Sequence, residues 1–265
     1  MSTAEKSPLF ASTLARGLEV LTAFRAGYPS MNLPELAAAT GMTKSAVQRF
    51  TYTLETLGYL RKDAQKRYRL TPRALTLGFG FLQTDSLIER ATPYLHEFNQ
   101  QCHESCNLSE PDAYDMVFVA RFPSHNRVMI PMPLGLRLPM YCTASGRAYL
   151  SRLAPEESRR LLEEMPRSAH TPSTLVDLER LNAAVETARD AGYAWIDSEY
   201  FPGDISLAAP VVDASGHPLG AINVGVPASR WSLVDAQREL APLLIETARA
   251  ISSAGQSQRA GNGLL

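Results

Sequence analysis

Apolar residues recur every three or four positions between residues 33 and 60, which predicts two short helices packed against each other. The seam between them would consist of Leu36, Ala37, Met42, Val47, Phe50, Leu54 and Leu57. Gly41 can adopt the left-handed conformation that ends the first helix, and Thr43 follows where the N-cap of the second belongs. The spacing from Ala37 to Gly41 is typical of a helix-turn-helix. An ordinary helical hairpin in a small bundle is the alternative.

The other side of the second helix is polar. It would present the side chains of Lys44, Ser45, Gln48, Arg49 and Tyr52 to the surface that the helix meets. We predict that this surface is the major groove of double-stranded DNA. Gln48 and Arg49 are expected to contact base edges, because their forked groups can pair with adenine and guanine respectively.

A short hairpin is predicted directly after these helices. Gly58 would end the second helix, residues 61–67 would form a basic turn, and Tyr68 and Leu70 would face inward from a returning strand. A hairpin in this place indicates the wing of a winged helix-turn-helix, although a solvated loop is the simpler interpretation. Phosphate contacts, which add affinity without sequence information, are expected from Lys44, Arg61, Lys62, Lys66 and Arg67.

Patterns in the rest of the chain predict an α+β protein. Helices are expected over residues 12–27, 86–106, 143–153, 155–165, 175–192 and 233–253, and strands over 115–121, 127–131, 205–212 and 219–226. We divide the chain into a winged helix-turn-helix domain (11–72), a linker helix (73–85) and an α/β sensor domain (86–254). Residues 1–10 and 255–265 are expected to be disordered tails.

Charge is divided unequally between the two parts. Residues 1–72 contain ten lysines and arginines against five acidic residues, a net charge of +5. The remainder contains sixteen basic and twenty-two acidic residues, a net charge of −6. This asymmetry indicates a nucleic-acid-binding part joined to a part with another task.

Several classes of protein are disfavoured by composition. No apolar run approaches the length of a membrane span, and the first residues lack the apolar core of a signal peptide. Three cysteines, an odd number, argue against a disulfide framework and for a reducing compartment. We therefore expect a cytoplasmic protein without membrane association.

Cys102, His103 and Cys106 raise the question of a metal site. On one helix they offer at most three ligands, whereas a structural zinc site needs four, and nothing but proximity to a loop suggests His125 as the fourth. No complete glycine-rich phosphate or dinucleotide motif is present. We predict neither a metal nor a cofactor.

Ser145 is the basis of an alternative hypothesis, a small-molecule hydrolase whose N-terminal part mediates assembly. His170 or His217 would act as its base. Ser145 lacks the flanking glycines of a nucleophile elbow, and neither histidine has a recognisable acidic partner. We favour capping or ligand contact for this hydroxyl and predict no catalytic residue. A ligand-independent architectural DNA binder is a third hypothesis.

Several motifs occur in an order that is more specific than any one of them. They are STLARGLEVLTAF, LPELAAATGMTKSAVQRF, LETLGYL and YRLTPRAL, followed by RLPMYCTASGRAYLSRL, TLVDLERLNAAVETARDAGYAWIDSEY and ISLAAPVVDASGHPLGAINVGVP. The chain resembles the IclR family of bacterial transcription regulators over nearly its whole length. The resemblance implies a winged DNA-binding domain, a linker helix used in dimerisation and a C-terminal GAF-like effector-binding domain. It also implies homodimers or homotetramers on palindromic operators.

The resemblance further implies a pocket for a small organic acid that controls catabolic genes. Carried over by position, its lining would include Ala144, Ser145, Asp197, Ser206, Asn223 and Gly225. Backbone N–H groups at Ala144 and Ser145, at a helix start, could hold a carboxylate. Some relatives have a cysteine in place of Ser206 and serines in place of Asn223 and Gly225. The arginine of YCTASGR, where many relatives have lysine, resembles the branch that regulates aromatic-acid breakdown. An aromatic or other small organic acid is therefore the expected effector.

Overall fold

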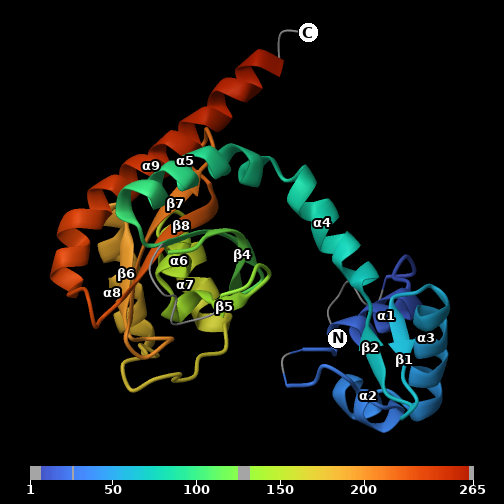
Figure 1. Cartoon of the computed structure of the whole chain (residues 1–265). Coiled ribbons are helices and arrows are strands. Elements are labelled where there is room, and N and C mark those ends of the chain that lie inside the picture. The colour runs from blue at the N-terminus through green and yellow to red at the C-terminus, as the bar shows by residue number, and fades with distance from the viewer. Residues whose placement is uncertain (1–6, 26, 125–131, 263–265) are drawn as a thin grey trace. The chain divides into compact units, whose positions relative to one another are not determined.

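The computed structural model describes residues 7–25, 27–124 and 132–262, with side chains described as far as residue 255. It divides into two compact units, Met1–Thr84 and Asp85–Leu265 (Figure 1). The strand predicted over residues 127–131 and the side chain of His125 lie outside the described residues. Among the described residues, no helix is both long enough and apolar enough to cross a membrane.

The first unit contains the predicted winged helix-turn-helix. Its elements are α1 (Ser12–Thr22), α2 (Leu33–Thr40), α3 (Lys44–Thr56), β1 (Leu60–Lys62), β2 (Tyr68–Leu70), η2 (Pro72–Ala74) and α4 (Leu75–Thr84). Gly41 ends α2 with a φ of +66°, and the Thr43 hydroxyl accepts a hydrogen bond from the Ala46 N–H at the start of α3. Local capping chemistry therefore sets the turn between the two helices, as the sequence predicts.

A small core holds this unit together. It consists of the buried side chains of Val20, Met31, Leu36, Val47, Leu54, Leu60 and Tyr68. Two expectations were wrong. Leu57 is 51% exposed because α3 ends before it, and Leu70 is 36% exposed because the chain leaves the hairpin at the next residue for η2. Helix α1 ends at Thr22, five residues before the predicted end.

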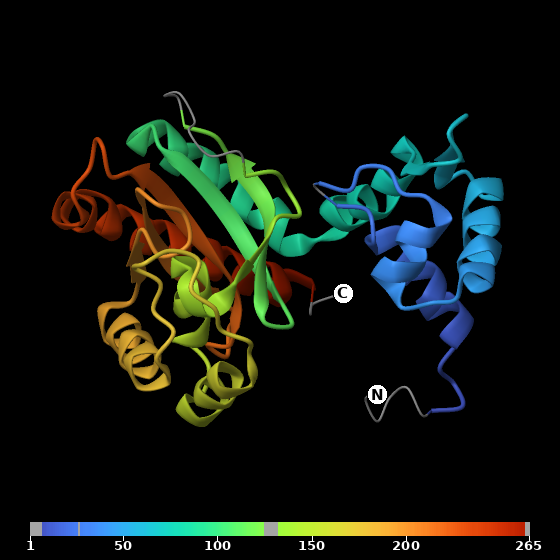
Figure 2. The ribbon, with the colours of Figure 1, turned by 90° about the horizontal axis from the view of Figure 1, so that it is seen from below.

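The second unit is built on one six-stranded antiparallel sheet in the order β5-β4-β3-β8-β7-β6. In chain order its strands are β3 (Ser105–Asp112), β4 (Asp115–Phe122), β5 (Arg137–Pro139), β6 (Ala194–Asp197), β7 (Asp204–Val212) and β8 (Pro218–Pro227). Its helices are α5 (Ser86–Cys102), η3 (Met140–Cys142), α6 (Ala144–Leu150), α7 (Pro155–Glu164), α8 (Leu178–Ala191) and α9 (Leu233–Asn262). Helices α5 and α9 pack on one face of the sheet, and α6 and α8 lie on the other (Figure 1 and Figure 2).

The two faces of β8 differ in a way that prepares a site. Ile222, Val224 and Val226 point into the core shared with α5 and α9. The alternate residues Asn223 and Gly225 face the opposite side and line a cavity there. Since side chains alternate along a strand, one strand supplies both a packed core and a cavity wall.

The second unit departs from prediction at two helix ends. Helix α5 stops at Cys102, because His103 takes a φ of +59° and the Asn99 side-chain amide donates to the Glu104 carbonyl at 2.7 Å. Strand β3 therefore occupies the end of the predicted helix 86–106. Helix α9 continues to Asn262, beyond residue 254, where we expected the domain to end. Strands β5 and β6 were not predicted.

Candidate functional site

Helix α3 presents a polar, exposed face. Lys44, Ser45, Gln48, Arg49 and Tyr52 are all exposed, and Tyr52 reaches 70%. Val47, Thr51 and Leu54 of the same helix are buried on its inner face. The Ser45 hydroxyl lies 3.2 Å from that of the N-cap Thr43. The helix thus presents a row of hydrogen-bond donors to solvent, while the packing of its inner face in the core fixes its position.

The wing carries exposed cations on its first strand and in its turn. Arg61, Lys62 and Lys66 are exposed, and Lys66 lies in the turn with a φ of +61°. The Lys62 ammonium is 5.4 Å from the centroid of the Tyr68 ring, a cation–π contact that orients it. These three charges have the exposure that phosphate contacts require.

Arg67, which we predicted to contact phosphate, is bound to other residues of the same unit. Its guanidinium donates to Glu35 Oε2 at 2.8 Å, and also to the carbonyl and hydroxyl of Ser30 at 2.6 and 3.0 Å. Glu35 also accepts from the Asn32 N–H in a capping box at the start of α2. These contacts lower the pKa of Glu35, with the Asn32 hydrogen bond as the larger cause and Arg67 as the next. Arg67 therefore links the wing to α2, and we leave it out of the residues that we propose to contact phosphate.

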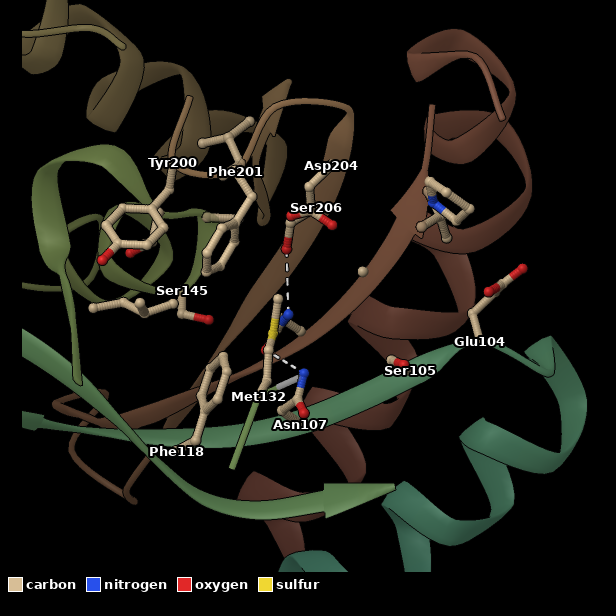
Figure 3. Close-up of a pocket in the computed structure, with 18 of the residues that line it drawn as sticks. Glu104, Ser105, Asn107, Phe118, Met132, Ser145, Tyr200, Phe201, Asp204 and Ser206 are labelled. Carbon is tan, nitrogen blue, oxygen red and sulfur yellow. Dashed lines mark hydrogen bonds between the residues drawn. The ribbon is translucent and has the colours of Figure 1, made fainter. Parts of the chain in front are cut away.

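The second unit contains a pocket of about 190 Å³ between the sheet and the start of α6 (Figure 3). Its apolar walls come from Met116, Phe118, Leu138, Ile196, Tyr200 and Phe201. A cavity of about 150 Å³ holds one benzene molecule. The pocket is therefore large enough for an acid built on a single ring. Five of the six predicted lining residues, all except Asp197, lie in it.

A row of polar side chains crosses the sheet along the pocket floor. The Asn107 amide donates to Asn223 Oδ1 at 3.3 Å, and the Asn223 amide donates to the Ser206 hydroxyl at 3.2 Å (Figure 3). Asn107 Oδ1 is buried and accepts no hydrogen bond from any described residue. A buried acceptor without a donor is costly, so this atom offers a hydrogen-bond acceptor to a molecule that enters the pocket.

Arg121 adds a positive charge beside this row. It lies opposite Asn107 on the neighbouring strand and lines the pocket, with one hydrogen bond to the Met132 carbonyl. No carboxylate of a described residue forms an ion pair with it. Burial alone lowers the pKa of its guanidinium. A half-buried cation without a counter-charge favours an anionic ligand.

Asp204, rather than Asp197, is the acidic residue of the pocket. Asp197 is exposed at the end of β6 and does not line the cavity. It was predicted from the family pattern, but its side chain points to the opposite face of β6 from that of Ile196, which does line the cavity. Burial, and secondarily the charge of Asp197, raise the pKa of Asp204 to about 7. A Cβ at Gly225 would lie 3.6 Å from Asp204 Oδ1, so the glycine leaves this carboxyl open to the cavity.

The raised pKa of Asp204 predicts a pH-dependent stability. Between its ordinary value of 3.8 and about 7, the folded chain holds a proton that the unfolded chain has lost. The free energy of unfolding therefore falls as pH rises through this window. Relative to Asp204→Asn, the wild-type protein should lose about 1–3 kcal/mol between pH 5 and pH 8.

Urea denaturation at both pH values measures this difference. Burial also raises the pKa of Glu110 to about 7. Glu110 is present in the wild type and in Asp204→Asn, so its contribution cancels in the difference between their free energies of unfolding. Asp190→Asn, at an exposed position of α8, is the matched control and should follow the wild type. Parallel pH curves for Asp204→Asn and the wild type would contradict the assignment.

The start of α6 is fixed from both sides. The Thr143 hydroxyl accepts from the Gly146 N–H at 3.2 Å, and a Cβ at Gly146 would lie 2.2 Å from the Met140 backbone. Ala144 and Ser145 are buried here and reach the pocket. Arg147 donates from Nη1 and Nη2 to the two oxygens of Glu199 at 2.7 and 2.6 Å. Glycine, cap and ion pair together hold the helix start against the cavity.

The far end of the pocket contains a second buried carboxylate. Glu104 accepts from the Trp231 indole N–H at 3.0 Å and from Arg230 at 2.8 Å. Its charge is therefore neutralised within the protein, unlike that of Arg121. No sequence pattern identified Glu104, Asn107 or Arg121 as pocket residues. Glu104 fell in the predicted helix 86–106, and Asn107 fell in no predicted element.

The residues of the hydrolase hypothesis do not come together. The His170 ring bonds to the Tyr141 hydroxyl at 3.1 Å, and His217 lies in the exposed turn between β7 and β8. No hydrogen bond joins either ring to Ser145 within the described ranges. Cys102 and Cys106 are 3.5 Å apart, and the described residues contain no cluster of three metal-binding side chains.

Comparison with known families decides the class of protein. A model of the C-terminal domain of the bacterial transcriptional regulator IclR matches residues 79–253, and a model of the IclR helix-turn-helix domain matches residues 13–64. The chain belongs to the IclR family. It is a DNA-binding transcriptional regulator, and the matched families give no support to the hydrolase hypothesis.

Individual IclR proteins are similar over most of their length. The Pca regulon regulatory protein of Pseudomonas putida is 33% identical, covering 91% of this chain and 83% of its own. The crystal structure of a transcriptional regulator from Rhodococcus sp. is 36% identical, with a TM-score of 0.81 and coverage of 94% and 99%. An IclR homologue from Microbacterium hydrocarbonoxydans, complexed with 4-hydroxybenzoate, shares the fold at 22% identity, with a TM-score of 0.75 and coverage of 92% and 99%.

Proposed function

We propose that this IclR regulator acts in the cytoplasm on catabolic genes, and that a small aromatic acid bound in its pocket controls its hold on a palindromic operator. The main support is the pairing of a ring-sized pocket with two unsatisfied groups. Among the described residues, Arg121 is a cation without a counter-charge, and Asn107 Oδ1 is an acceptor without a donor. A hydroxylated aromatic acid carries both missing partners.

The DNA contacts follow from the exposed face of α3. Gln48 and Arg49 would read base edges in the major groove, with Lys44, Ser45 and Tyr52 beside them. Arg61 and Lys62 on the first strand of the wing, and Lys66 in its turn, would hold phosphates. Each of these side chains is exposed in the isolated unit.

A homodimer would present two such helices to two half-sites, and two dimers would form a homotetramer. Helix α4 supports this assembly, because none of its residues is buried and four large apolar side chains are exposed on it. They are Leu75, Leu77, Phe79 and Phe81. An apolar helix of this kind requires a partner in water.

The effector would bind with its ring between the apolar walls and its carboxylate on Arg121. Its hydroxyl would donate to Asn107 Oδ1, beside the Ser206 and Asn223 side chains, while Gly225 leaves space next to Asp204. Ala144 and Ser145 would close the cavity from the start of α6. The 4-hydroxybenzoate bound by the Microbacterium homologue has this combination of groups.

Fluorescence anisotropy with labelled duplexes tests the proposal. Duplexes from the region upstream of the gene and of its neighbours should bind with strong salt dependence, and 4-hydroxybenzoate should change the affinity of the specific complex. Calorimetry should show benzoate binding at least tenfold more weakly than 4-hydroxybenzoate, because benzoate leaves Asn107 Oδ1 unpaired. Equal affinities for the two acids would reject the proposed contact between the effector and Asn107. Equal binding to all duplexes would reject the proposed specific operator.

Arg121→Gln should reduce the affinity for 4-hydroxybenzoate by about tenfold or more, since a charge-assisted hydrogen bond to the carboxylate is lost. Calorimetric titration measures the loss. Arg152→Gln, at an exposed position outside the pocket, is the control and should bind as the wild type does. If Arg121→Gln binds equally well, the carboxylate is held elsewhere.

A further inference from the structure

Two thiols face each other where α5 ends and β3 begins. The Sγ atoms of Cys102 and Cys106 are 3.5 Å apart, and both thiols are directed at the Glu104 carbonyl, at 3.9 and 3.4 Å. A disulfide has an S–S bond of about 2.05 Å, so a small movement of either side chain would bring the sulfurs to bonding distance. The left-handed His103 already folds the chain back between them.

The two thiols differ in access. Cys102 is half-buried and open to small solutes, whereas Cys106 is fully buried. The Cys106 hydrogen bond is the main cause that lowers the pKa of the Cys102 thiol. Burial is the main cause that raises the pKa of the Cys106 thiol. Cys102 is therefore the thiol that ionises first, and thiolates rather than thiols attack oxidants.

We propose that Cys102 and Cys106 are a reversible oxidation site that closes to an intramolecular disulfide in response to a hydroperoxide. The Cys102 thiolate attacks the terminal oxygen of the peroxide, the O–O bond breaks, and the alkoxide or hydroxide leaves with a proton as alcohol or water. The Cys106 sulfur then attacks the resulting Cys102 sulfenic acid. An S–S bond forms, the S–O bond breaks, and water leaves with the Cys106 proton. Two thiols are oxidised and one peroxide is reduced.

The location gives this modification a consequence for the pocket, which rests on the proposed function. The disulfide would enclose His103, Glu104 and Ser105 in a short ring, and the last two line the pocket. Glu104 also holds Arg230 and the Trp231 indole, which precede α9. Tightening this turn would shift one end of the cavity, so the oxidised and reduced forms should bind effector differently. Disulfides of reducing compartments are typically transient and redox-sensing.

Peptide mapping of the full chain tests the modification without any effector. The reduced protein is treated with hydrogen peroxide, its remaining thiols are alkylated under denaturing conditions, and it is digested with trypsin. Both cysteines fall in peptide 91–121, which should lose two hydrogen atoms and take up no alkyl group. Dithiothreitol should restore two alkylation sites. Cys142, which is buried with a pKa raised by burial to about 12, is the internal control and should remain alkylated.

Two variants separate the steps. Cys102→Ser should abolish the reaction with peroxide at this site. Cys106→Ala should stop it at the Cys102 sulfenic acid, which dimedone traps as a stable adduct. The proposal is overturned if both thiols of the wild type stay alkylatable, if Cys142 oxidises equally fast, or if the only disulfide joins two chains and gives a peptide of double mass.

Calorimetry with 4-hydroxybenzoate then compares the reduced and oxidised proteins. We expect the dissociation constants to differ by threefold or more, and the difference to vanish in Cys102→Ser. Identical constants would overturn the coupling to the pocket. Failure of the reduced protein to bind the acid would reject the proposed effector instead, and the peptide map would still report on the disulfide.

Discussion

Replacement of Arg147 by alanine should lower the free energy of unfolding of the effector-binding unit by about 3–5 kcal/mol. Arg147 is 4% exposed and forms a two-pronged ion pair with Glu199, and its Nε donates to the Tyr141 carbonyl at 3.0 Å. Without it, the buried Glu199 carboxylate keeps the hydrogen bond from the Leu175 N–H but loses its counter-charge. Urea denaturation followed by circular dichroism measures the loss.

Arg159→Ala is the matched control. Arg159 also pairs with Glu163 and Glu179, but its side chain is half exposed, so its removal should lower the free energy of unfolding far less than the removal of Arg147. Arg147→Lys keeps the positive charge but cannot bind both oxygens of Glu199 at once. It should therefore recover only part of the free energy of unfolding that Arg147→Ala loses. An Arg147→Ala protein as stable as Arg159→Ala would show that the pair does not hold the start of α6.

Arg49→Ala should weaken binding to the specific operator by about 1–3 kcal/mol and relax the preference at one base pair. The expectation follows from the position of Arg49 near the middle of α3, on its exposed face and next to Gln48. Anisotropy titrations against the operator and its single-base variants measure both effects. Arg49 is exposed, so the unfolding free energy should remain that of the wild type.

Lys62→Ala provides the contrast. A lost phosphate contact should weaken binding to all duplexes alike and reduce the slope of log affinity against log salt by about 1. If Arg49→Ala behaves in the same way, with a uniform loss and an altered salt slope, Arg49 holds a phosphate and another side chain reads the base.

The sequence predicted the helix-turn-helix well because its signals are local. Gly41 and Thr43 determine the turn through backbone conformation and capping, and the apolar spacing of α3 needs no distant partner. The end of α5 carries no such signal. The left-handed residue there is His103 instead of a glycine, and Cys102 and Cys106 continue the helical spacing into what is a strand.

The pocket was predicted in part for a related reason. Residues named by family position, such as Ser145, Ser206 and Asn223, do line it. Arg121 and Asn107 become neighbours only through the register of β3 with β4, and no pattern within either strand encodes that register. Ile196 rather than Asp197 is the β6 residue that lines the cavity, because successive side chains of a strand point to opposite faces, and which face meets the cavity is likewise a property of the assembled sheet.

The double use of Glu35 has a consequence for redesigning operator specificity. One carboxylate caps α2 and also binds Arg67 of the wing, so this ion pair links the helix pair to the wing in addition to the core that they share. If α2 and α3 were transplanted from another regulator without position 67, the ion pair between α2 and the wing would be lost. Positions 35 and 67 should therefore be exchanged together as one module.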